Sequence, residues 1–372
     1  MSSQKVVVAM SGGVDSSVAA LMLKEAGYDV IGVSMQVWDY RQNGGSCSRA
    51  SCCAPSDFLD ARKVAATLNV PYYVFDFEES FRREVIEPFA DAYINGLTPN
   101  PCVDCNSKVK FKELRNRASA IGASLVATGH YAEIVASDVV SGKKTFRLYR
   151  GRDRLKDQSY FLYGITQSEL ARTLFPIGHL TKLEVRDIAK RHQLVTAEKP
   201  ESQDICFVSG KVSRFINKIG RKGIEGKLRL LSGEIVGEHE GIENFTVGQR
   251  KGLGIGGSLR PLYVTEIDSE KGDVFLGTKE ELEKYDFYFG AVNWVDFEIL
   301  KKIESGELIK DLPCVAQVRS RHCGSAAVLS VIDNNNVKVS FTEKPPVVSP
   351  GQTVALYDTD NRYLLGGGKI LK

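Results

Sequence analysis

The feature that most constrains the fold of this chain is a glycine-rich turn between a short apolar run and a helical pattern. Residues 6–10 are apolar, Ser11-Gly12-Gly13 follow directly, and apolar residues then recur at three- and four-residue spacing over residues 16–26. A strand that passes through such a turn into a helix directs backbone N–H groups and the positive end of the helix dipole toward the turn. The pattern therefore predicts a βα unit that can bind a polyphosphate.

The first two hundred residues continue this alternation of β-branched or aromatic runs with helical patterns. Further strands are expected at residues 30–35, 72–77 and 125–128, and helices at 56–68, 80–94 and 108–121. A β-hairpin is expected over residues 134–150, and shorter helices at 168–174 and 183–192. This order is typical of an α/β fold with a doubly wound, mostly parallel sheet.

The pattern changes after Cys206, where glycines become frequent and apolar residues alternate over short runs. Strands are expected at residues 227–231, 262–267, 273–276, 314–319, 326–332, 336–341 and 353–357. Because 372 residues exceed what one hydrophobic core usually supports, we expect several domains. The predicted division is an α/β domain over residues 1–208, a small central β-rich domain over 209–283 and a C-terminal β-barrel-like domain over 284–372.

Composition and charge place the chain among soluble globular proteins. No apolar stretch approaches the roughly 20 residues that a membrane-spanning helix needs, and the N-terminus lacks a signal-type cleavage site, so we expect a cytoplasmic protein without a membrane partner. In that reducing compartment the eight cysteines are not expected to form a disulfide framework, and those that cluster become candidate metal ligands or catalytic thiols. The net charge of +3 neither requires nor excludes a nucleic-acid partner.

The turn is neither a P-loop, because the Gly-Lys-Ser/Thr ending is missing, nor the Gly-x-Gly-x-x-Gly of dinucleotide-binding proteins. A tight turn without a ligand is the alternative, but Ser11-Gly12-Gly13-Val14-Asp15-Ser16 resembles the loop of the ATP pyrophosphatases. This resemblance implies that ATP is cleaved with Mg²⁺ between the α- and β-phosphates, that Ser11, Ser16 and Ser17 bind phosphate, and that Asp15 holds the metal or shapes the loop. The implied nucleotide-binding residues are Ala9, Met10, Ser11, Gly12, Gly13, Val14, Asp15, Ser16, Met35 and Gly129.

Cysteines form a second group of candidates. Cys102-Val103-Asp104-Cys105 lies in a proline-punctuated loop before a lysine-rich helix, where a helix N-terminus favours the thiolate, and Cys206 is a third candidate. One of these thiols could be a nucleophile and another a sulfur donor. Another cluster could bind a metal or a sulfur donor, although we favour an incidental role; it consists of Cys47, Cys52 and Cys53. Cys314 and Cys323 are expected to be buried small apolar residues.

Several motifs together carry a more specific resemblance. They are Asn-Pro-x-x-x-Cys-Asn at residues 100–106, Ala-Thr-Gly-His-Tyr at 127–131, Lys-Asp-Gln-Ser-Tyr-Phe-Leu at 156–162, Asp-Ile-Cys-Phe at 204–207 and Gly-Gln-Arg-Lys-Gly-Leu-Gly at 248–254. In register from residue 5 to residue 352, the chain resembles the bacterial tRNA-specific 2-thiouridylases. The resemblance implies that ATP adenylates the C2 oxygen of the wobble uridine in the tRNA anticodon stem-loop, and that persulfide sulfur then displaces AMP.

The same resemblance implies roles for the thiols and for a partner. Cys206 would carry the persulfide, and Cys105 would be the second thiol, acting as nucleophile or closing a disulfide with Cys206. The sulfur would come from a donor such as a cysteine desulfurase or a sulfur-relay protein. A uridine carbonyl oxygen leaves poorly until it carries AMP, and only a deprotonated thiol or persulfide attacks well near neutral pH.

Cys102 departs from the best-known members of the family, which have an aspartate at this position. Together with Cys105 and Cys206 it could instead hold a [4Fe-4S] cluster whose open iron binds sulfide, although a full ligand set usually has four members. The persulfide and the cluster interpretations both stay open at this point.

Basic stretches at residues 108–117, 143–156 and 214–229 could be solvated faces, but together they fit phosphate contacts along a folded RNA. We expect a flipped uridine to be read by Asn100, Pro101 and Cys102. The resemblance adds further tRNA-binding residues, namely His130, Lys156, Asp157, Gln158, Arg319, Ser320 and Gln352. His130 could equally be a buried histidine, and Ser320 replaces a tyrosine of the family pattern, which removes a stacking side chain.

Two other functions account for only part of the sequence. An amidotransferase-type ligase would leave the C-x-x-C motif and the basic stretches unexplained. A non-catalytic RNA- or metal-binding module would leave the intact glycine-rich turn unexplained.

Overall fold

The structure is a computed structural model that describes residues 3–38, 55–140, 143–201, 205–208, 210–256, 260–333 and 335–372. Its N-terminal part is built on a five-stranded parallel sheet with the order β3-β2-β1-β4-β7. The strands are β1 (Lys5–Ala9), β2 (Asp29–Gln36), β3 (Tyr72–Asp76), β4 (Leu125–Ala127) and β7 (Thr173–Leu174). Four of these strands confirm the sequence prediction, and β7 was not predicted.

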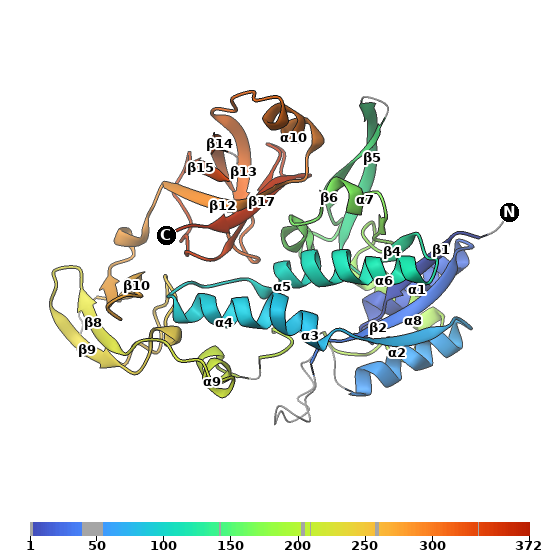
Figure 1. The fold of residues 1–372 in the computed structure, drawn as a ribbon, viewed down its shortest axis with the longest axis horizontal. Coiled ribbons are helices and arrows are strands. Elements are labelled where there is room, and N and C mark those ends of the chain that lie inside the picture. Colours follow the sequence, from blue (N-terminus) through green and yellow to red (C-terminus); the bar gives the residue numbers. More distant parts are fainter. Residues whose placement is uncertain are drawn as a thin grey trace.

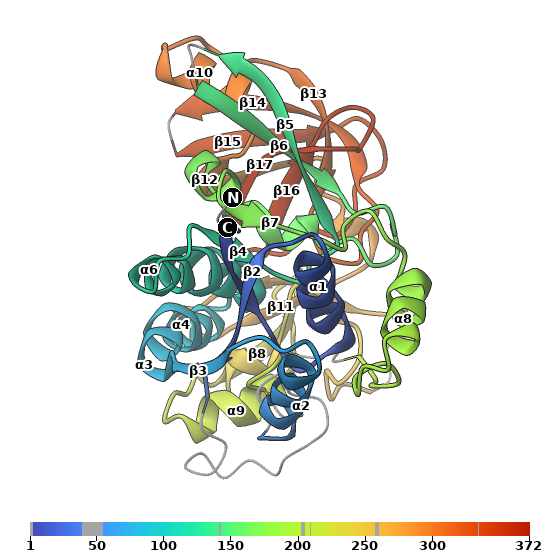
Figure 2. The same cartoon turned by 90° about the vertical axis from the view of Figure 1, so that its right-hand side faces the viewer.

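Helices cover both faces of this sheet, so the predicted doubly wound α/β fold is confirmed (Figure 2). Alternate residues of β1 point to opposite faces of the sheet: Val6 and Val8 pack into the apolar cluster on one face, and Val7 packs into the cluster on the other. The first layer contains α1 (Val14–Glu25), α2 (Pro55–Thr67) and α8 (Lys182–Arg191). The second contains α3 (Glu78–Phe81), η1 (Arg82–Ile86), α4 (Glu87–Ile94), η2 (Cys105–Glu113), α6 (Leu114–Ala120) and α9 (Val212–Lys218).

Two predicted helices differ from the structure. The helix expected at residues 108–121 begins earlier, as α5 (Pro101–Asp104), and continues through the wider turns of η2 into α6. It begins there because Pro101 suits a first helical position and the Asn100 side chain accepts a hydrogen bond from the Cys102 N–H at 3.2 Å. The helix expected at 168–174 was wrong in its second half, since α7 (Gln167–Leu170) ends before the edge strand β7.

A hairpin projects from the sheet domain toward the C-terminal domain (Figure 1). It is formed by β5 (Ala132–Val140) and β6 (Lys143–Arg150), which pair antiparallel as predicted. A short η3 turn (Ser159–Leu162) follows it.

A small central sheet follows, with the strand order β10-β11-β8-β9 and an apolar cluster of its own. Its strands are β8 (Gly226–Leu230), β9 (Ile235–His239), β10 (Tyr263–Ile267) and β11 (Val274–Gly277), and two short turns, η4 (Ile242–Asn244) and η5 (Glu280–Leu282), accompany them. Three of these strands were predicted, and β9 was missed.

The C-terminal part is a closed six-stranded barrel, with the order β12-β15-β14-β13-β16-β17 and the helix α10 (Phe297–Glu304). Its strands are β12 (Asp286–Trp294), β13 (Leu312–Gln317), β14 (Ser325–Asp333), β15 (Asn336–Phe341), β16 (Thr353–Tyr357) and β17 (Leu364–Ile370). β12 and β17 were not predicted. In β17, Gly367 carries no side chain because a Cβ there would overlap the Val354 carbonyl oxygen and lie 2.8 Å from the Tyr163 ring.

The barrel does not stand apart from the sheet domain. One apolar cluster draws Tyr160 and Leu162 of η3 and Leu148 of the hairpin together with Tyr357 and Leu364 of the barrel. The barrel therefore lies above the helix that carries the C-x-x-C motif (Figure 1). Among the described residues, no helix is both long enough and apolar enough to cross a membrane.

Candidate active site

The glycine-rich turn connects the end of β1 to the first turn of α1. Gly12 has a φ of +72°, and a Cβ at this position would overlap the carbonyl oxygen of Asp57, because the first turn of α2 packs on the turn. Ser16 and Ser17 donate hydrogen bonds to the Gly13 carbonyl, at 3.2 and 2.8 Å, and the Ser11 N–H donates to Ser16 Oγ at 3.1 Å. The serine hydroxyls thus order the turn from within.

The predicted adenosine neighbours lie at the same edge of the sheet. Parallel strands present their carboxyl ends together, and this edge is where α/β folds bind ligands. Met35 is near the end of β2, and Gly129 follows β4 at a point where a Cβ would lie 2.6 Å from the Ser16 backbone nitrogen. Ala9 ends β1 and is partly exposed, whereas the Met10 and Val14 side chains are buried. Met10 and Val14 can therefore contribute backbone groups only.

A buried lysine that sequence analysis missed faces this turn. Lys182, the first residue of α8, places Nζ 2.8 Å from both carboxylate oxygens of Asp15 and 2.9 Å from Glu201 Oε1. Its side chain is only 10% exposed. Asp15 also accepts a hydrogen bond from the Tyr131 hydroxyl at 2.7 Å, and Glu201 pairs with Lys156 at 2.7 Å. The result is a chain of alternating charges beside the glycine-rich turn.

These contacts shift two ionisations. Burial, together with the neighbouring Asp15 carboxylate, raises the pKa of Tyr131, so this hydroxyl stays protonated. Burial acts to raise the pKa of Glu201, but Lys156 and Lys182 outweigh it and hold that pKa below 4.5. The only sequence signal near Lys182 marks the start of its helix, because Thr181 and Glu184 form a capping box around it.

The three candidate thiols lie on or near the second helical layer. Cys102 is exposed in the first turn of α5, whereas Cys105 and Cys206 are partly exposed. Both Cys105 and Cys206 border the same apolar cluster beneath the sheet. Phe207 anchors the Cys206 segment there, with its ring 5.3 Å from that of Phe89. The structure thus brings the two predicted catalytic cysteines to one layer from positions far apart in the sequence.

The placement of these thiols can be tested against an iron–sulfur cluster. Within the described ranges, no group of three or more His, Cys, Asp or Glu side chains could hold a metal ion. Cys102, Cys105 and Cys206 as placed therefore do not fit a cluster, which needs convergent thiolates. The predicted second group, Cys47, Cys52 and Cys53, lies outside the described residues.

The other two cysteines differ from each other. Cys314 is buried as expected, and burial raises the pKa of its thiol to about 12. The expectation was wrong for Cys323, which is exposed in the loop after β13.

The acidic residue within the C-x-x-C motif ties it to the barrel. Asp104 is 10% exposed and pairs with Lys108 at 3.2 Å and with Lys369 of β17 at 3.1 Å. Next to it, the Thr98 N–H donates to the Pro350 carbonyl at 2.9 Å. This brings Gln352 and the barrel segment around it close to the cysteine loop.

The predicted tRNA-binding residues fall into two classes. Cys102, Arg319 and Ser320 are exposed, and Lys156 is partly exposed. Others are held inside the protein: Pro101 is buried, the Asp157 side chain is 5% exposed and pairs with Arg150, and the Gln158 side chain accepts a hydrogen bond from the Tyr131 N–H at 3.0 Å. As RNA contacts these residues stay predictions.

His130 behaves as a packed histidine. Its ring lies 6.0 Å from Phe111 and 5.7 Å from Phe175, and its Nδ1 is 2.6 Å from Thr128 Oγ1. His130 is partly exposed, but burial of its ring, with a smaller effect of Lys110, lowers the pKa of His130 well below its ordinary value. These contacts favour the structural interpretation left open by the sequence.

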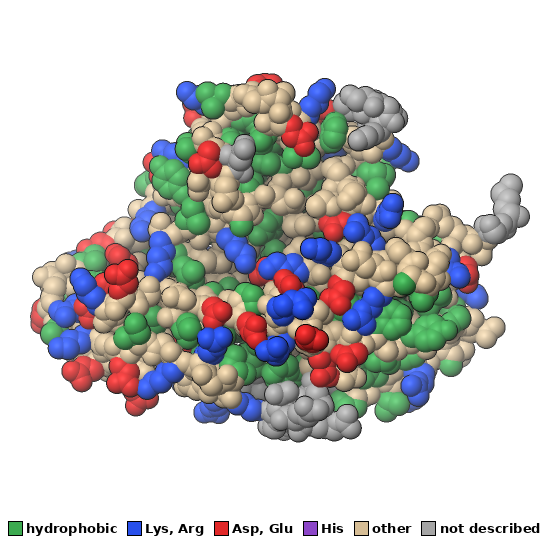
Figure 3. Space-filling model, in the orientation of Figure 1, with side chains coloured by type: hydrophobic (Ala, Val, Ile, Leu, Met, Phe, Trp, Pro, Cys, Tyr) green, Lys and Arg blue, Asp and Glu red, His purple; other side chains and the backbone are tan. Residues whose placement is uncertain are grey.

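The basic stretches do not merge into one cationic face in the view of Figure 3, where Lys and Arg side chains over the helices alternate with Asp and Glu. Several of their members are paired, as Lys108 is with Asp104 and Arg117 with Glu113. A contact with RNA phosphates at these positions would therefore exchange an existing ion pair.

Comparison with protein families covers most of the chain. Residues 4–210 match a family described as the tRNA methyl transferase HUP domain, residues 213–278 the tRNA methyl transferase PRC-barrel domain and residues 286–370 the aminomethyltransferase beta-barrel domain. The sequence is 44% identical over 371 residues to the tRNA-specific 2-thiouridylase MnmA of Geobacter metallireducens, covering 99% of this chain and 96% of that protein. It is 42% identical over 380 residues to the protein of the same name from Koribacter versatilis, covering 99% of each.

Proposed function

This chain belongs to the family of tRNA-specific 2-thiouridylases, and on that premise we propose that it uses ATP to replace the C2 oxygen of the wobble uridine in tRNA with sulfur. It is accordingly an ATP-dependent sulfurtransferase that acts on tRNA, which confirms the expectation from the motifs. The observation that carries the proposal for this chain is the turn at Gly12, which follows a central parallel strand, precedes a helix and faces the buried Lys182.

The first step is adenylation of the uridine. Backbone N–H groups of the turn and the N-terminus of α1 would bind the phosphates that leave as pyrophosphate, while the uridine oxygen attacks the α-phosphorus and forms the bond to AMP. Lys182 supports this step because it neutralises Asp15, whose charge would otherwise repel the phosphates. Mg²⁺ is usually held by one or two carboxylates together with substrate phosphates. Both oxygens of Asp15, the carboxylate at this turn, pair with Lys182, so Asp15 would hold the ion only by exchanging this contact. Bound there, the ion would neutralise charge that develops on the phosphates.

The second step transfers sulfur. The terminal sulfur of a Cys206 persulfide attacks C2, and the C2–O bond breaks to release AMP. Cys105 as thiolate then attacks the Cys206 sulfur, so that the persulfide S–S bond breaks, the terminal sulfur stays on the base and a Cys105–Cys206 disulfide forms. An external thiol reductant restores the two thiols, and a desulfurase or relay protein reloads Cys206. Their shared position at the border of one apolar cluster supports this pairing.

The target base would enter beside the exposed Cys102. Asn100 caps the helix through its contact with the Cys102 N–H, and Pro101 is buried, so both residues would shape the pocket rather than reach into it. The base must leave the anticodon stack to reach this position. The domain division at residues 208 and 283 and the cytoplasmic location stay part of the proposal.

The proposal is tested by incubating the protein with unmodified tRNA, ATP, Mg²⁺ and a sulfide or persulfide source, followed by nucleoside analysis. We expect 2-thiouridine and tRNA-dependent release of pyrophosphate. With the persulfide source, Cys105→Ser and Cys206→Ser should abolish thiolation while pyrophosphate release continues, because adenylation needs neither thiol. Absence of 2-thiouridine under both aerobic and anaerobic conditions would overturn the proposal.

Two controls sharpen this test. Cys314→Ala removes a buried thiol of the barrel that has no part in the reaction, so its thiolation rate should match the wild type. Iron analysis of anaerobically purified protein checks the cluster alternative independently of activity.

A further inference from the structure

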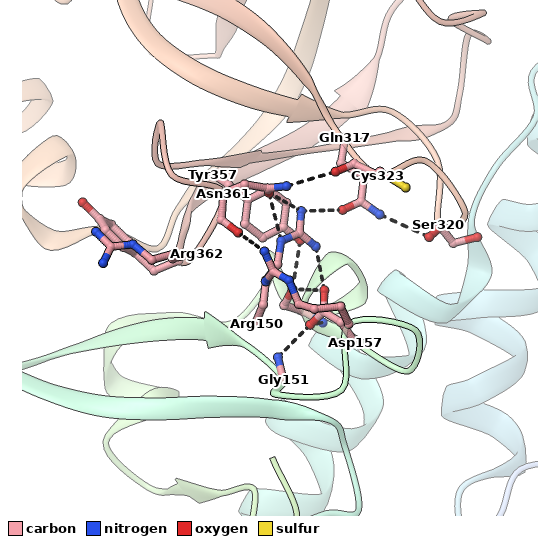
Figure 4. Close-up of polar contacts among 12 residues, drawn as sticks. Arg150, Gly151, Asp157, Gln317, Ser320, Cys323, Tyr357, Asn361 and Arg362 are labelled. Atoms are coloured by element: carbon pink, nitrogen blue, oxygen red, sulfur yellow. Dashed lines mark hydrogen bonds and ion pairs between the residues drawn. The ribbon is translucent and has the colours of Figure 1, made fainter. Parts of the chain in front are cut away.

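A buried arginine joins the hairpin to the barrel at the place where their loops meet. Arg150 ends β6, and its guanidinium donates to Asp157 Oδ2 at 2.6 Å, to Gln317 Oε1 at 2.9 Å, and twice to Asn361 Oδ1 at 2.7 and 3.0 Å (Figure 4). It also lies over the Tyr357 ring, 3.5 Å from its centroid. The side chains of Arg150 and Asp157 are 7% and 5% exposed. An ion pair this deeply buried is kept in place by its other hydrogen bonds.

On the hairpin side, this contact closes the loop over residues 151–158. Asp157 accepts hydrogen bonds from the Gly151 N–H at 2.9 Å and the Ser159 N–H at 3.2 Å, and from the Ser159 hydroxyl at 2.9 Å. The carboxylate therefore joins the two ends of the loop. Between them the loop exposes Leu155, whose exposed fraction is 94%, next to Arg154 and Lys156.

On the barrel side, the same guanidinium fixes the loop over residues 318–323. Gln317 uses its carbonyl for the guanidinium, and its Nε2 donates to the carbonyls of Arg319 and Ser320 at 3.3 and 3.2 Å. Asn361 likewise donates to the Cys323 carbonyl at 3.0 Å. The side chains of Gln317 and Asn361 therefore each connect the guanidinium to the backbone of the loop 318–323 by hydrogen bonds.

These contacts demand an arginine. The planar guanidinium presents N–H donors in a fixed fork and stacks on an aromatic ring, whereas a lysine ammonium is a point charge that can serve the Asp157 carboxylate but not the whole set. One group thus sets the relative position of two loops that are far apart in the sequence. Both loops expose cationic side chains, and an apolar side chain between cations is a combination that contacts nucleic acid.

We propose that Arg150 is a positioning residue for RNA binding, which holds the loops 151–158 and 318–323 together as one surface that contacts the tRNA backbone. The inference rests on the proposed function, because it takes tRNA as the ligand. It assigns to Asp157 the task of shaping its loop rather than of touching RNA.

The test compares Arg150→Met, Arg150→Lys and Gln317→Leu in steady-state thiolation. Both Arg150 variants should raise KM for tRNA by about tenfold or more, the loss expected when an ordered set of phosphate contacts is weakened, and should leave KM for ATP unchanged. Lysine should not restore tRNA binding, because it cannot make the fork of contacts. Gln317→Leu keeps the buried ion pair and cuts one of the two links to the loop 318–323, so it should raise KM for tRNA even where Arg150→Met folds poorly.

If the Arg150 guanidinium connects the two loops, the effects of the Arg150 and Gln317 variants should not be additive. Adding Gln317→Leu to Arg150→Met should change KM for tRNA no further. Hydrogen exchange of the free protein should rise in both loops in Arg150→Met, and only in 318–323 in Gln317→Leu. Arg186→Met is the matched control, because Arg186 also joins two segments, through the carbonyls of Ala197 and Lys199, but contacts neither loop.

The outcomes separate this inference from the proposed function. Wild-type protein that neither binds nor thiolates tRNA would overturn both. Wild-type activity with an unchanged KM for tRNA in Gln317→Leu and Arg150→Lys would overturn only the role of Arg150, as would a parallel loss of kcat and ATP binding or unchanged exchange in the two loops.

Discussion

The buried lysine beside the glycine-rich turn makes the most demanding prediction, because its removal should affect stability and catalysis together. In Lys182→Met, Asp15 and Glu201 lose the cation that lies 2.8 and 2.9 Å from them. Hydrogen bonds to charged groups contribute about 1.5–3 kcal/mol each. The two carboxylates are 31% and 29% exposed, so water can partly replace the lysine, and the lower end applies. We therefore expect a loss of about 3 kcal/mol in the free energy of unfolding, or roughly 150-fold in the unfolding equilibrium.

The matched control is Lys190→Met on the same helix. Lys190 pairs with Glu198 at 2.9 Å, but the two side chains are 54% and 80% exposed, so water replaces this contact and the stability of Lys190→Met should stay close to that of the wild type. Urea unfolding of both variants, followed by tryptophan fluorescence and by circular dichroism, measures the difference.

The catalytic part of the prediction uses tRNA-dependent pyrophosphate release. Without Lys182, the Asp15 carboxylate faces the phosphates unneutralised, so Lys182→Met should raise KM for ATP and lower the rate, while Lys190→Met should match the wild type. The reasoning is refuted if Lys182→Met loses no more stability than Lys190→Met, or if it releases pyrophosphate at the wild-type rate.

Three further predictions follow from the same structure. Gly12→Ala should abolish ATP binding, measured by nucleotide titration, and should lose more stability in urea unfolding than Gly27→Ala. Both glycines have a positive φ, which costs an alanine about 1–2 kcal/mol. Only at Gly12 would the added Cβ also overlap backbone atoms. The folded-state pKa of Glu201 is lowered, so its ionised form stabilises the fold above pH 4.5, and this stabilisation is lost as the pH falls through the folded-state pKa. Urea unfolding as a function of pH should therefore show a free energy of unfolding that decreases in acid, and the decrease should be smaller in Glu201→Gln. Asp104→Asn and Lys369→Gln should speed alkylation of the C-x-x-C thiols by loosening that turn from the barrel, with non-additive effects in the double variant; equal alkylation rates would contradict this coupling.

Much of the architecture could be predicted because its signals are local. The apolar run of β1, the turn at Gly12 and the periodicity of α1 are each contained within about one helix length of sequence, and they predict a βα unit without knowledge of the rest. The edge strand β7 has only two residues, which is too short for an apolar periodicity that would predict a strand. The glycine-rich β17 lacks the usual strand composition, since its glycines are there to let neighbouring strands and rings approach.

By itself, the sequence determined that this chain has a glycine-rich turn between a strand and a helix and the motifs of a tRNA-thiolating family, and it predicted an anion site at the turn and three candidate thiols. Only the tertiary structure decided which charged groups act together. Lys182 meets Asp15 and Arg150 meets Gln317 across 167 residues of sequence in each case. Neither pairing produces a periodic pattern in the sequence, because the partner of a buried charge depends on how distant segments pack together. The desolvation penalty of that charge is offset only after these segments have packed.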